Sequence, residues 1–176
     1  KYAAGIFDKA LGPLENAHWG NVAARRSFED KNGIPDVVRH IEFVTIGING
    51  FGRIGRLVFR KLQQAGGFNV ACINDITDAK TLAYLLKYDS VHGVYPGTVT
   101  SEADAIIVDG KKYKVTAEKD PSKLPWKELG VQIVIEGTGV FTSREKLSMH
   151  ITAGAKKVLL TTPAKDEIDA TVVVGV

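Results

Sequence analysis

The stretch that decides the fold is FVTIGINGFGRIG, residues 43–55. Its first half, Phe43 to Ile48, is an apolar run typical of a buried strand, and an amphipathic helix is expected from Arg53 to Gln64. Between them, glycines at positions 50, 52 and 55 fill the G-x-G-x-x-G pattern. In that pattern the first glycine allows a tight turn, the second lets the backbone approach a pyrophosphate, and the third lets the helix pack on the strand. The sequence therefore predicts a diphosphate at the N-terminus of this helix, where backbone N–H groups and the helix dipole favour an anion.

An acidic residue stands where this pattern requires one. Gly66 and Gly67 end the predicted helix, a second strand is expected from Phe68 to Ile73, and Asp75 follows about 20 residues after Gly55. A carboxylate there would accept hydrogen bonds from both hydroxyls of the adenosine ribose and would repel a 2′-phosphate. NAD is therefore the expected cofactor, in preference to NADP. The alternative is a glycine turn with a helix-capping aspartate at a chance position, and it leaves the surrounding strand, helix and spacing unexplained.

The rest of the sequence continues the alternation of strand and helix. Because several strands are apolar on both faces, the pattern predicts an α/β fold, a Rossmann doubly wound, mainly parallel sheet over residues 43–176. The pair Asp109-Gly110 predicts a small antiparallel hairpin inserted into that sheet. The expected elements are the hairpin strands Ala105–Val108 and Lys112–Thr116, helices at Ala79–Lys87 and Ser143–Ala153, and strands at Val131–Ile135, Lys157–Thr161 and Thr171–Val174.

Residues 1–42 are predicted to form an irregular N-terminal extension ahead of this domain. Glycines and prolines interrupt any long periodicity, and the acidic residues nearly match the basic ones, which argues against a retained transit peptide. The aromatic residues of the segment (Tyr2, Phe7, Trp19 and Phe28) indicate that it packs on something, because a disordered tail holds fewer of them. The first residue is Lys1 rather than Met, so the start of the gene product is expected to lie upstream.

Composition narrows the classes of function. The 176 residues carry a formal net charge of +3, and the basic residues are interleaved with acidic ones, so no nucleic-acid-binding surface is indicated. No apolar run approaches the length of a transmembrane helix. The single cysteine, Cys72, is expected in the core, and one thiol favours a reducing compartment. His92 and His150 lack a neighbouring nucleophile or metal-ligand spacing, so structural or surface roles are expected for them, and Trp126 is expected to pack in the interior.

Several motifs together resemble a known family. They are INGFGRIGR at 48–56, IND at 73–75, LLKYDSVHG at 85–93, EGTGVFT at 136–142 and GAKK at 154–157. In this order they resemble the N-terminal half of phosphorylating glyceraldehyde-3-phosphate dehydrogenase, the NAD-dependent enzyme of glycolysis. The resemblance covers residues 43–176 without a long gap, and five motifs in register make it specific.

The resemblance implies a set of residues around the cofactor. The backbone of Arg53 and Ile54 would meet the pyrophosphate, Lys119 would lie near the adenine, and Thr161 would place a hydroxyl near the nicotinamide ribose. A turn that includes Thr138 would close over the adenosine, and Ile76 after Asp75 resembles the NAD-using members. The implied cofactor-binding residues are Gly50, Phe51, Gly52, Arg53, Ile54, Gly55, Asn74, Asp75, Lys119, Thr138, Gly139, Phe141 and Thr161.

The catalytic part of the family pattern is not reached. Family members continue from a strand like residues 171–176 into an Asn and then Ser-x-x-x-Cys-Thr-Thr-Asn, whose cysteine attacks the aldehyde, and a second domain supplies a histidine. Whether the chain is an enzyme therefore stays uncertain, and the 176 residues alone are expected to be inactive in the family reaction, the oxidative phosphorylation of glyceraldehyde 3-phosphate. The substrate domain is likewise missing from this sequence.

Three interpretations of the whole chain follow. The chain is part of an NAD-dependent glyceraldehyde-3-phosphate dehydrogenase, or a non-catalytic subunit of a larger assembly docked through residues 1–42, or a free-standing NAD-binding regulator. In each case a protein partner, a second copy of the chain or further chain is expected to cover the exposed face of the domain. The family favours the cytoplasm, and an organelle (plastid or mitochondrion) is left open.

Overall fold

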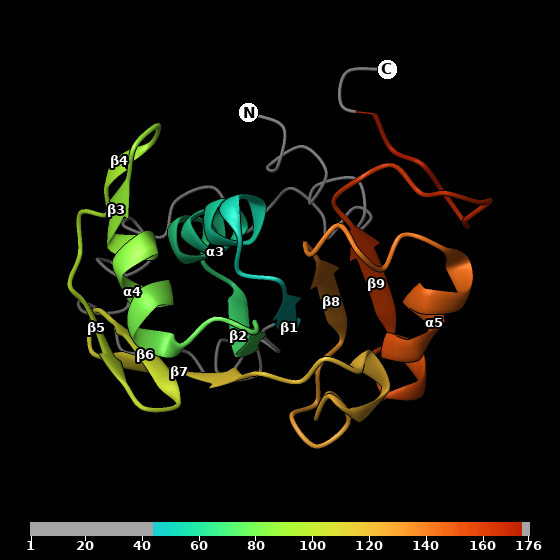
Figure 1. Ribbon diagram of the computed structural model, residues 1–176, viewed down its shortest axis with the longest axis horizontal. Helices are drawn as coiled ribbons and strands as arrows, with labels where there is room; N and C mark the ends of the chain where they lie inside the picture. The colour runs from blue at the N-terminus through green and yellow to red at the C-terminus, as the bar shows by residue number, and fades with distance from the viewer. Residues whose placement is uncertain (1–43, 174–176) are drawn as a thin grey trace, which may run out of the picture.

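The computed structural model describes residues 44–173, so the predicted extension at 1–42 lies outside the described residues (Figure 1). Helices and strands alternate along the first part of the chain, as the sequence predicts. The elements are β1 (Val44–Asn49), α3 (Arg53–Ala65), β2 (Phe68–Asn74), α4 (Ala79–Lys87), β3 (Tyr88–Asp89), β4 (Gly93–Val94), β5 (Val99–Glu102), β6 (Ala105–Val108), β7 (Lys111–Thr116), the 3-10 helix η2 (Pro121–Lys123), β8 (Ile133–Glu136), α5 (Arg144–Thr152) and β9 (Lys157–Leu160).

The strands form a seven-stranded sheet in the order β5-β6-β7-β2-β1-β8-β9. The strands from β7 to β9 in this order are parallel, whereas β5, β6 and β7 are antiparallel to one another. The chain runs outward from β1 through β2 on one side and returns to β8 on the other side. The strand order therefore reverses between β1 and β8, and in open α/β sheets a ligand binds outside the carboxyl ends of the strands at such a switch point.

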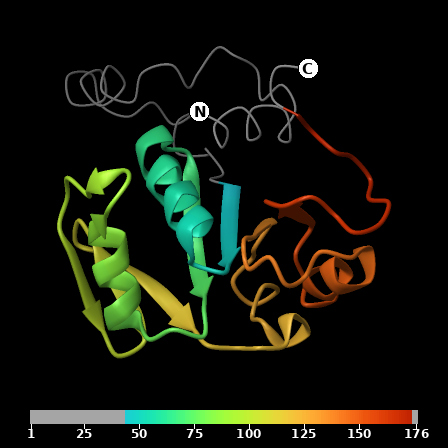
Figure 2. The same cartoon turned by 45° about the horizontal axis from the view of Figure 1, so that its top comes forward.

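Both faces of the sheet are covered. Side chains of β1 alternate, because Ile46 and Ile48 pack with α3 and α4 while Gly47 faces Trp126 on the other face. A Cβ added at Gly47 would lie 2.6 Å from Cζ3 of Trp126, so the ring occupies the space that the glycine leaves. In Figure 2, α3 and α4 lie together on one half of the domain and α5 lies on the other half, near β9. The predicted doubly wound, mainly parallel α/β fold is confirmed.

The predicted hairpin is confirmed at its turn. Val108 pairs with Lys111, and the two residues between them, Asp109 and Gly110, have φ of 50° and 81°. Positive φ at both central positions is the geometry that this dipeptide favours between twisted strands. The hairpin is buried against the helices through Tyr113, whose ring meets Phe59 edge to face at 4.9 Å. Burial raises the pKa of Tyr113 to about 12.

Three predicted details need correction. Residues 171–173 form no strand, although a strand was predicted over Thr171–Val174, of which Val174 lies outside the described residues. A run of valines makes a strand only where a neighbour takes its hydrogen bonds, and β9 pairs with β8 alone among the described strands. The strand β8 begins at Ile133 rather than Val131, because the Val131 amide donates to Trp126 O (2.9 Å) in the preceding loop. The short strands β3, β4 and β5 were not predicted.

In the described part of the chain, no helix combines the length and the apolar character needed to cross a membrane.

Candidate functional site

The loop between β1 and α3 is pressed against the turn that follows β8. Gly50 has φ +90°, and its N–H donates to Asn74 O (2.8 Å) at the end of β2. A Cβ at this position would lie 2.6 Å from the backbone N of Thr138. Gly137 N in turn donates to Asn49 O (2.7 Å), which ties the β8 turn to the end of β1. The two sides of the strand-order reversal therefore meet through backbone, with no space for a side chain between them.

The other two glycines of the loop differ in what surrounds them. A Cβ at Gly55 would lie 2.1 Å from Gly50 O, so the first turn of α3 can rest on the loop only without a side chain. A Cβ at Gly52 would meet no protein atom within 4 Å. The fold therefore requires glycine at position 55, while at position 52 a glycine leaves an open cradle beside the backbone. Such a cradle is what the close approach of a pyrophosphate needs.

The N-terminus of α3 faces this cradle with its backbone amides. Gly52 is the N-cap and supplies no side-chain hydrogen bond, and no acidic residue stands in the first turn. The first N–H groups of a helix have no partner within the helix, and the helix dipole makes this end positive. Arg53 and Ile54 are exposed there, whereas the Phe51 side chain is fully buried and contacts Phe59 edge to face at 5.6 Å. Phe51 therefore contributes only its backbone to the loop.

Asp75 lies at the carboxyl end of β2 with its carboxylate fixed by two backbone amides. Oδ2 accepts from Phe51 N (2.7 Å) in the glycine loop, and Oδ1 accepts from Thr77 N (2.9 Å). Each carboxylate oxygen can accept a second hydrogen bond, so both remain able to meet ligand hydroxyls. The side chain is half-buried, and the exposed Ile76 follows it.

A buried carboxylate shapes the opposite wall. Glu136, at the end of β8, is fully buried, and its Oε1 accepts from the backbone N–H of Thr138 (2.8 Å) and from the Thr138 hydroxyl. The Thr138 hydroxyl oxygen accepts from Val140 N (3.1 Å), and Gly139 has φ +73°. The exposed turn of Thr138, Gly139 and Val140 is therefore held in one shape by a residue beneath it.

Two asparagines extend this arrangement across the strand ends. Asn49 Nδ2 donates to Glu136 Oε2 (2.6 Å), and Asn49 Oδ1 accepts from Asn74 Nδ2 (2.7 Å). Asn74 also receives Glu118 N (2.9 Å) on Oδ1 and donates to Glu118 O (2.8 Å). The segment after β7 is thereby fixed beside β2, with Lys119 exposed at the same edge of the sheet.

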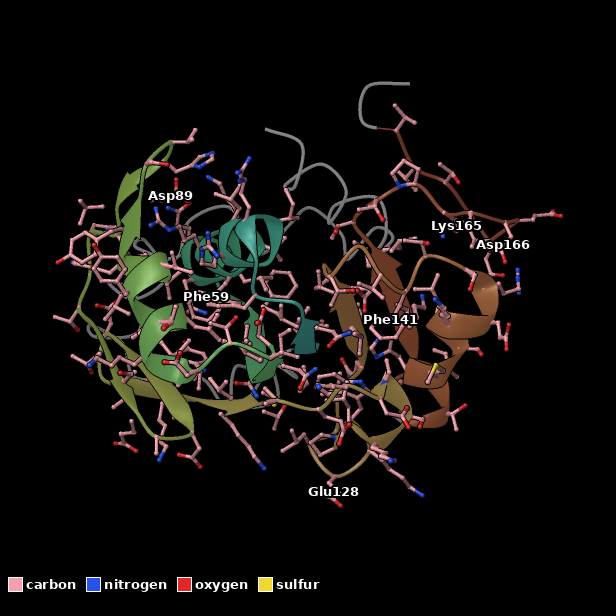
Figure 3. All side chains as sticks on the ribbon, in the orientation of Figure 1. Phe59, Asp89, Glu128, Phe141, Lys165 and Asp166 are labelled. Carbon is pink, nitrogen blue, oxygen red and sulfur yellow. The ribbon has the colours of Figure 1, made fainter. Side chains whose placement is uncertain are left out.

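On the side of β9, Thr161 directs both its N–H and its hydroxyl at Glu136 O (3.1 and 3.0 Å). Phe141, labelled in Figure 3, meets the His150 ring edge to face at 6.4 Å. The structure thus places the predicted cofactor residues on the loops that follow β1, β2, β7, β8 and β9, along one edge of the sheet.

Sequence reasoning missed residues that support this edge from inside. Asn49 and Glu136 contact its loops and were not among the predicted site residues, although each is a polar residue that ends an otherwise apolar strand. The roles expected for three others are confirmed, because Cys72, Trp126 and His150 are all fully buried. Among residues 44–173, no group of three or more His, Cys, Asp or Glu side chains is arranged to hold a metal ion.

Comparisons with known proteins agree with this geometry. Residues 44–144 match the family model described as glyceraldehyde 3-phosphate dehydrogenase, NAD binding domain. Among curated proteins, glyceraldehyde-3-phosphate dehydrogenase of Thermotoga maritima is 61% identical over 132 residues, which are 74% of this chain and 39% of that protein. The protein of the same name from Zymomonas mobilis is 55% identical over 135 residues, 76% of this chain and 40% of that protein. Glyceraldehyde-3-phosphate dehydrogenase A of Escherichia coli is 54% identical over 123 residues, 70% of this chain and 37% of that protein. The chain therefore spans about two fifths of the length of these relatives.

The contrast between the two glycines predicts that they fail in different ways when a methyl group is added. Gly55→Ala is expected to destabilise the fold by about 1–3 kcal/mol, because the methyl group overlaps Gly50 O. Gly52→Ala is expected to change the free energy of unfolding by less than about 1 kcal/mol, because its methyl group meets open space. Urea unfolding of the two variants beside the wild type measures both values.

The same pair tests the cradle. We expect Gly52→Ala to weaken NAD binding by about tenfold or more at unchanged stability, because the methyl group occupies the place of the pyrophosphate. Isothermal titration of the folded variant provides the measurement. Wild-type affinity in Gly52→Ala would show that no ligand group comes close to this backbone.

Proposed function

The chain belongs to the family of glyceraldehyde-3-phosphate dehydrogenase NAD-binding domains, and we propose that it binds NAD across the carboxyl ends of its parallel strands. The observation that carries this proposal is the open cradle at Gly52, between the free amides of α3 and the fixed carboxylate of Asp75. No other described glycine of the G-x-G-x-x-G loop has space beside it, since Gly50 and Gly55 are both enclosed by backbone.

The residues divide the cofactor among them. The first-turn amides of α3, at Arg53 and Ile54, would hold the pyrophosphate through hydrogen bonds and the helix dipole. Asp75 would accept the hydroxyls of the adenosine ribose, and the turn of Thr138 and Gly139 would close over the adenosine. Lys119 would lie near the adenine. These assignments are supported by the position of each residue along one edge of the sheet.

Toward the other end of the cofactor, the Thr161 hydroxyl would lie near the nicotinamide ribose. Phe141 would pack behind the β8 turn, where it already contacts His150. The cofactor itself supplies hydride acceptance, and the residues of this chain orient it.

Asp75 also supports a preference for NAD over NADP. Its carboxylate cannot turn away from the ribose side without losing the hydrogen bonds from Phe51 N and Thr77 N. A 2′-phosphate would therefore meet a negative charge held in place, and like charges at short distance repel.

We expect the wild-type chain to bind NAD at least about tenfold more tightly than NADP. Asp75→Asn is expected to lower the affinity for NAD and to reduce that ratio to within about threefold, because the charge is lost at nearly constant shape. Fluorescence titration with both nucleotides measures the ratio in each variant.

The matched control is Asp78→Asn, which removes a neighbouring carboxylate from the N-cap of α4. Asp78 accepts from Thr81 N (2.9 Å), and asparagine caps helices as well as aspartate does. This variant should keep the wild-type preference. A wild-type chain that binds NADP as tightly as NAD would refute the preference, and a wild-type chain that binds neither would refute the proposed function.

The family reaction is proposed for the whole protein to which such a domain contributes, and not for these 176 residues alone. The only thiol in the sequence belongs to Cys72, which is fully buried in β2, and burial raises its pKa. A nucleophilic cysteine needs an accessible, activated thiolate beside a base. We therefore assign to this chain the binding and orientation of the cofactor.

The 176-residue polypeptide is accordingly expected to show no turnover with glyceraldehyde 3-phosphate, NAD and phosphate. NADH absorbance at saturating substrate measures the rate, and Thermotoga maritima glyceraldehyde-3-phosphate dehydrogenase serves as the positive control. NADH formation that persists in the purified chain and disappears in Gly52→Ala would contradict this assignment.

The second candidate, a subunit of a larger assembly, is favoured by the surface of α4 and the β3–β4 hairpin. Tyr84, Tyr88, Val91 and Val94 expose between 51% and 76% of their surface there, which is unusual for large apolar side chains lying close together. The rings of Tyr84 and Tyr88 also contact each other at 4.9 Å. The hairpin stands at one end of the molecule in Figure 1, and Asp89, labelled in Figure 3, belongs to it. We propose that a partner, with a second copy of the chain as the first candidate, covers this surface.

Sedimentation of the chain at increasing concentration is expected to give a mass above 19.0 kDa, the mass of one copy. Val91→Glu should return the mass to that of one copy, because a charge would be buried in the contact. Ile151→Glu, on an exposed apolar side chain of α5, is the matched control and should not change the association. A wild-type chain that stays at 19.0 kDa throughout would contradict self-association through this surface.

A further inference from the structure

A continuous line of buried hydrogen bonds runs beneath the candidate cofactor site without lining it. Trp126 Nε1 donates to His150 Nδ1 (3.1 Å), and His150 Nε2 lies 3.0 Å from Glu136 Oε2. The line continues from Glu136 through Asn49 to Asn74. Each of these five side chains is at least 96% buried, and the ends of the line are anchored in different elements, the loop after η2 and strand β2.

The direction of these hydrogen bonds is determined by the indole. An indole N–H can only donate, so His150 Nδ1 accepts, and the ring carries its proton on Nε2. Nε2–H therefore donates to Glu136 Oε2. At the other end, the Asn49 amide is oriented by Asn74, because Asn49 Oδ1 accepts from Asn74 Nδ2 and only Nδ2 remains for Glu136. The donors on Oε2 cannot change their roles without breaking a bond farther along the line.

The carboxylate of Glu136 consequently has all its acceptor sites in use. Oε2 accepts from His150 and Asn49, while Oε1 accepts from the N–H and the hydroxyl of Thr138. One oxygen therefore holds the interior line and the other holds the exposed turn. Through Asn49, which precedes Gly50, the same side chain also bears on the glycine loop.

We propose that Glu136 is a positioning residue for the cofactor: it sets the turn of Thr138, Gly139 and Val140 at a fixed distance from the glycine loop, so that the adenosine end of NAD enters a groove that is already formed. This inference rests on the proposed NAD binding and adds the residue that organises it. Glu136 itself touches no ligand, because it is fully buried beneath the turn. Preorganisation of this kind increases affinity by removing the ordering cost of the loop on binding.

Glu136→Gln is the sharpest test, because it keeps the shape and replaces one acceptor by a donor. If the new NH2 group faces Thr138, it opposes the backbone N–H, which cannot reorient. If it faces the interior, it opposes Nε2–H of His150 and the amide of Asn49, which are held in place by Trp126 and Asn74. Either orientation leaves buried donors unpaired, so the turn is expected to loosen.

The matched control is Tyr113→Phe, which removes one partly buried hydrogen bond, from the Tyr113 hydroxyl to Gln63 Oε1 (2.7 Å), away from both loops. We expect Glu136→Gln to weaken both NAD and AMP binding by on the order of tenfold, whereas Tyr113→Phe retains wild-type affinity at a comparable loss of stability. Titration calorimetry and urea unfolding on the full chain measure the two quantities. Equal weakening in both variants would reduce Glu136 to a structural role and overturn the proposal.

Amide hydrogen exchange of the unliganded chain separates this proposal from the proposed function. In Glu136→Gln, the amides of Thr138 and Val140 should exchange on the order of tenfold faster than in the wild type, and in Tyr113→Phe they should not. Unchanged exchange overturns the positioning role even if NAD binds. Absence of NAD and AMP binding by the wild type overturns the proposed function instead. Should Glu136→Gln not fold, Thr138→Val, which alters an exposed side chain, must still speed exchange at Val140, whose N–H it deprives of its acceptor.

Discussion

The structure depends on a backbone contact between the loop after β1 and the first turn of α3. A Cβ at Gly55 would lie 2.1 Å from Gly50 O, and one at Gly50 would lie 2.6 Å from Thr138 N, so three segments meet where no side chain fits. This approach brings the positive end of α3 to the carboxyl ends of β1 and β8. It also explains the difference at Gly52, the glycine that no protein atom approaches. The packing of the fold accounts for the first and third glycines, and only a ligand accounts for the second.

Close backbone contact brings polar residues into the interior, and the fold pairs each of them. The carboxylate of Glu136 would be costly if it were buried alone, but its oxygens meet hydrogen-bond donors from β1, α5 and its own turn. Because Trp126 can only donate and Asn49 is oriented by Asn74, the hydrogen-bond directions along the line are unique. Such an arrangement has one satisfied state, so it specifies the spacing of the loops as well as stabilising them.

The parts of the molecule that sequence predicts well are those determined by local chemistry. The glycine loop, the helix ends at Gly66 and Ser143, and the Asp109-Gly110 turn depend on backbone preferences of a few adjacent residues. The line from Trp126 to Asn49 could not be predicted in this way, because its hydrogen bonds join residues 24, 14 and 87 positions apart that only the folded sheet brings together. The strand β5, VTSE, lacks the apolar run of a core strand, and it forms because the hairpin strand β6 pairs with it. The opposite error at residues 171–173 has the same cause, since valines without a neighbouring strand remain extended chain.

The position of the cofactor edge explains how one short domain can hold a long ligand. Because the strand order reverses at β1, the loops after β1 and β2 lie on one side of the switch point and those after β8 and β9 on the other. Asp75 and the amides of α3 belong to the first group, Thr138 and Thr161 to the second, and Glu136 is hydrogen-bonded to members of both. A ligand spanning the edge would therefore contact loops whose relative position was set during folding. In this arrangement recognition of the dinucleotide requires no residue beyond the sheet, whereas chemistry on a second substrate requires a nucleophile that the buried Cys72 cannot provide.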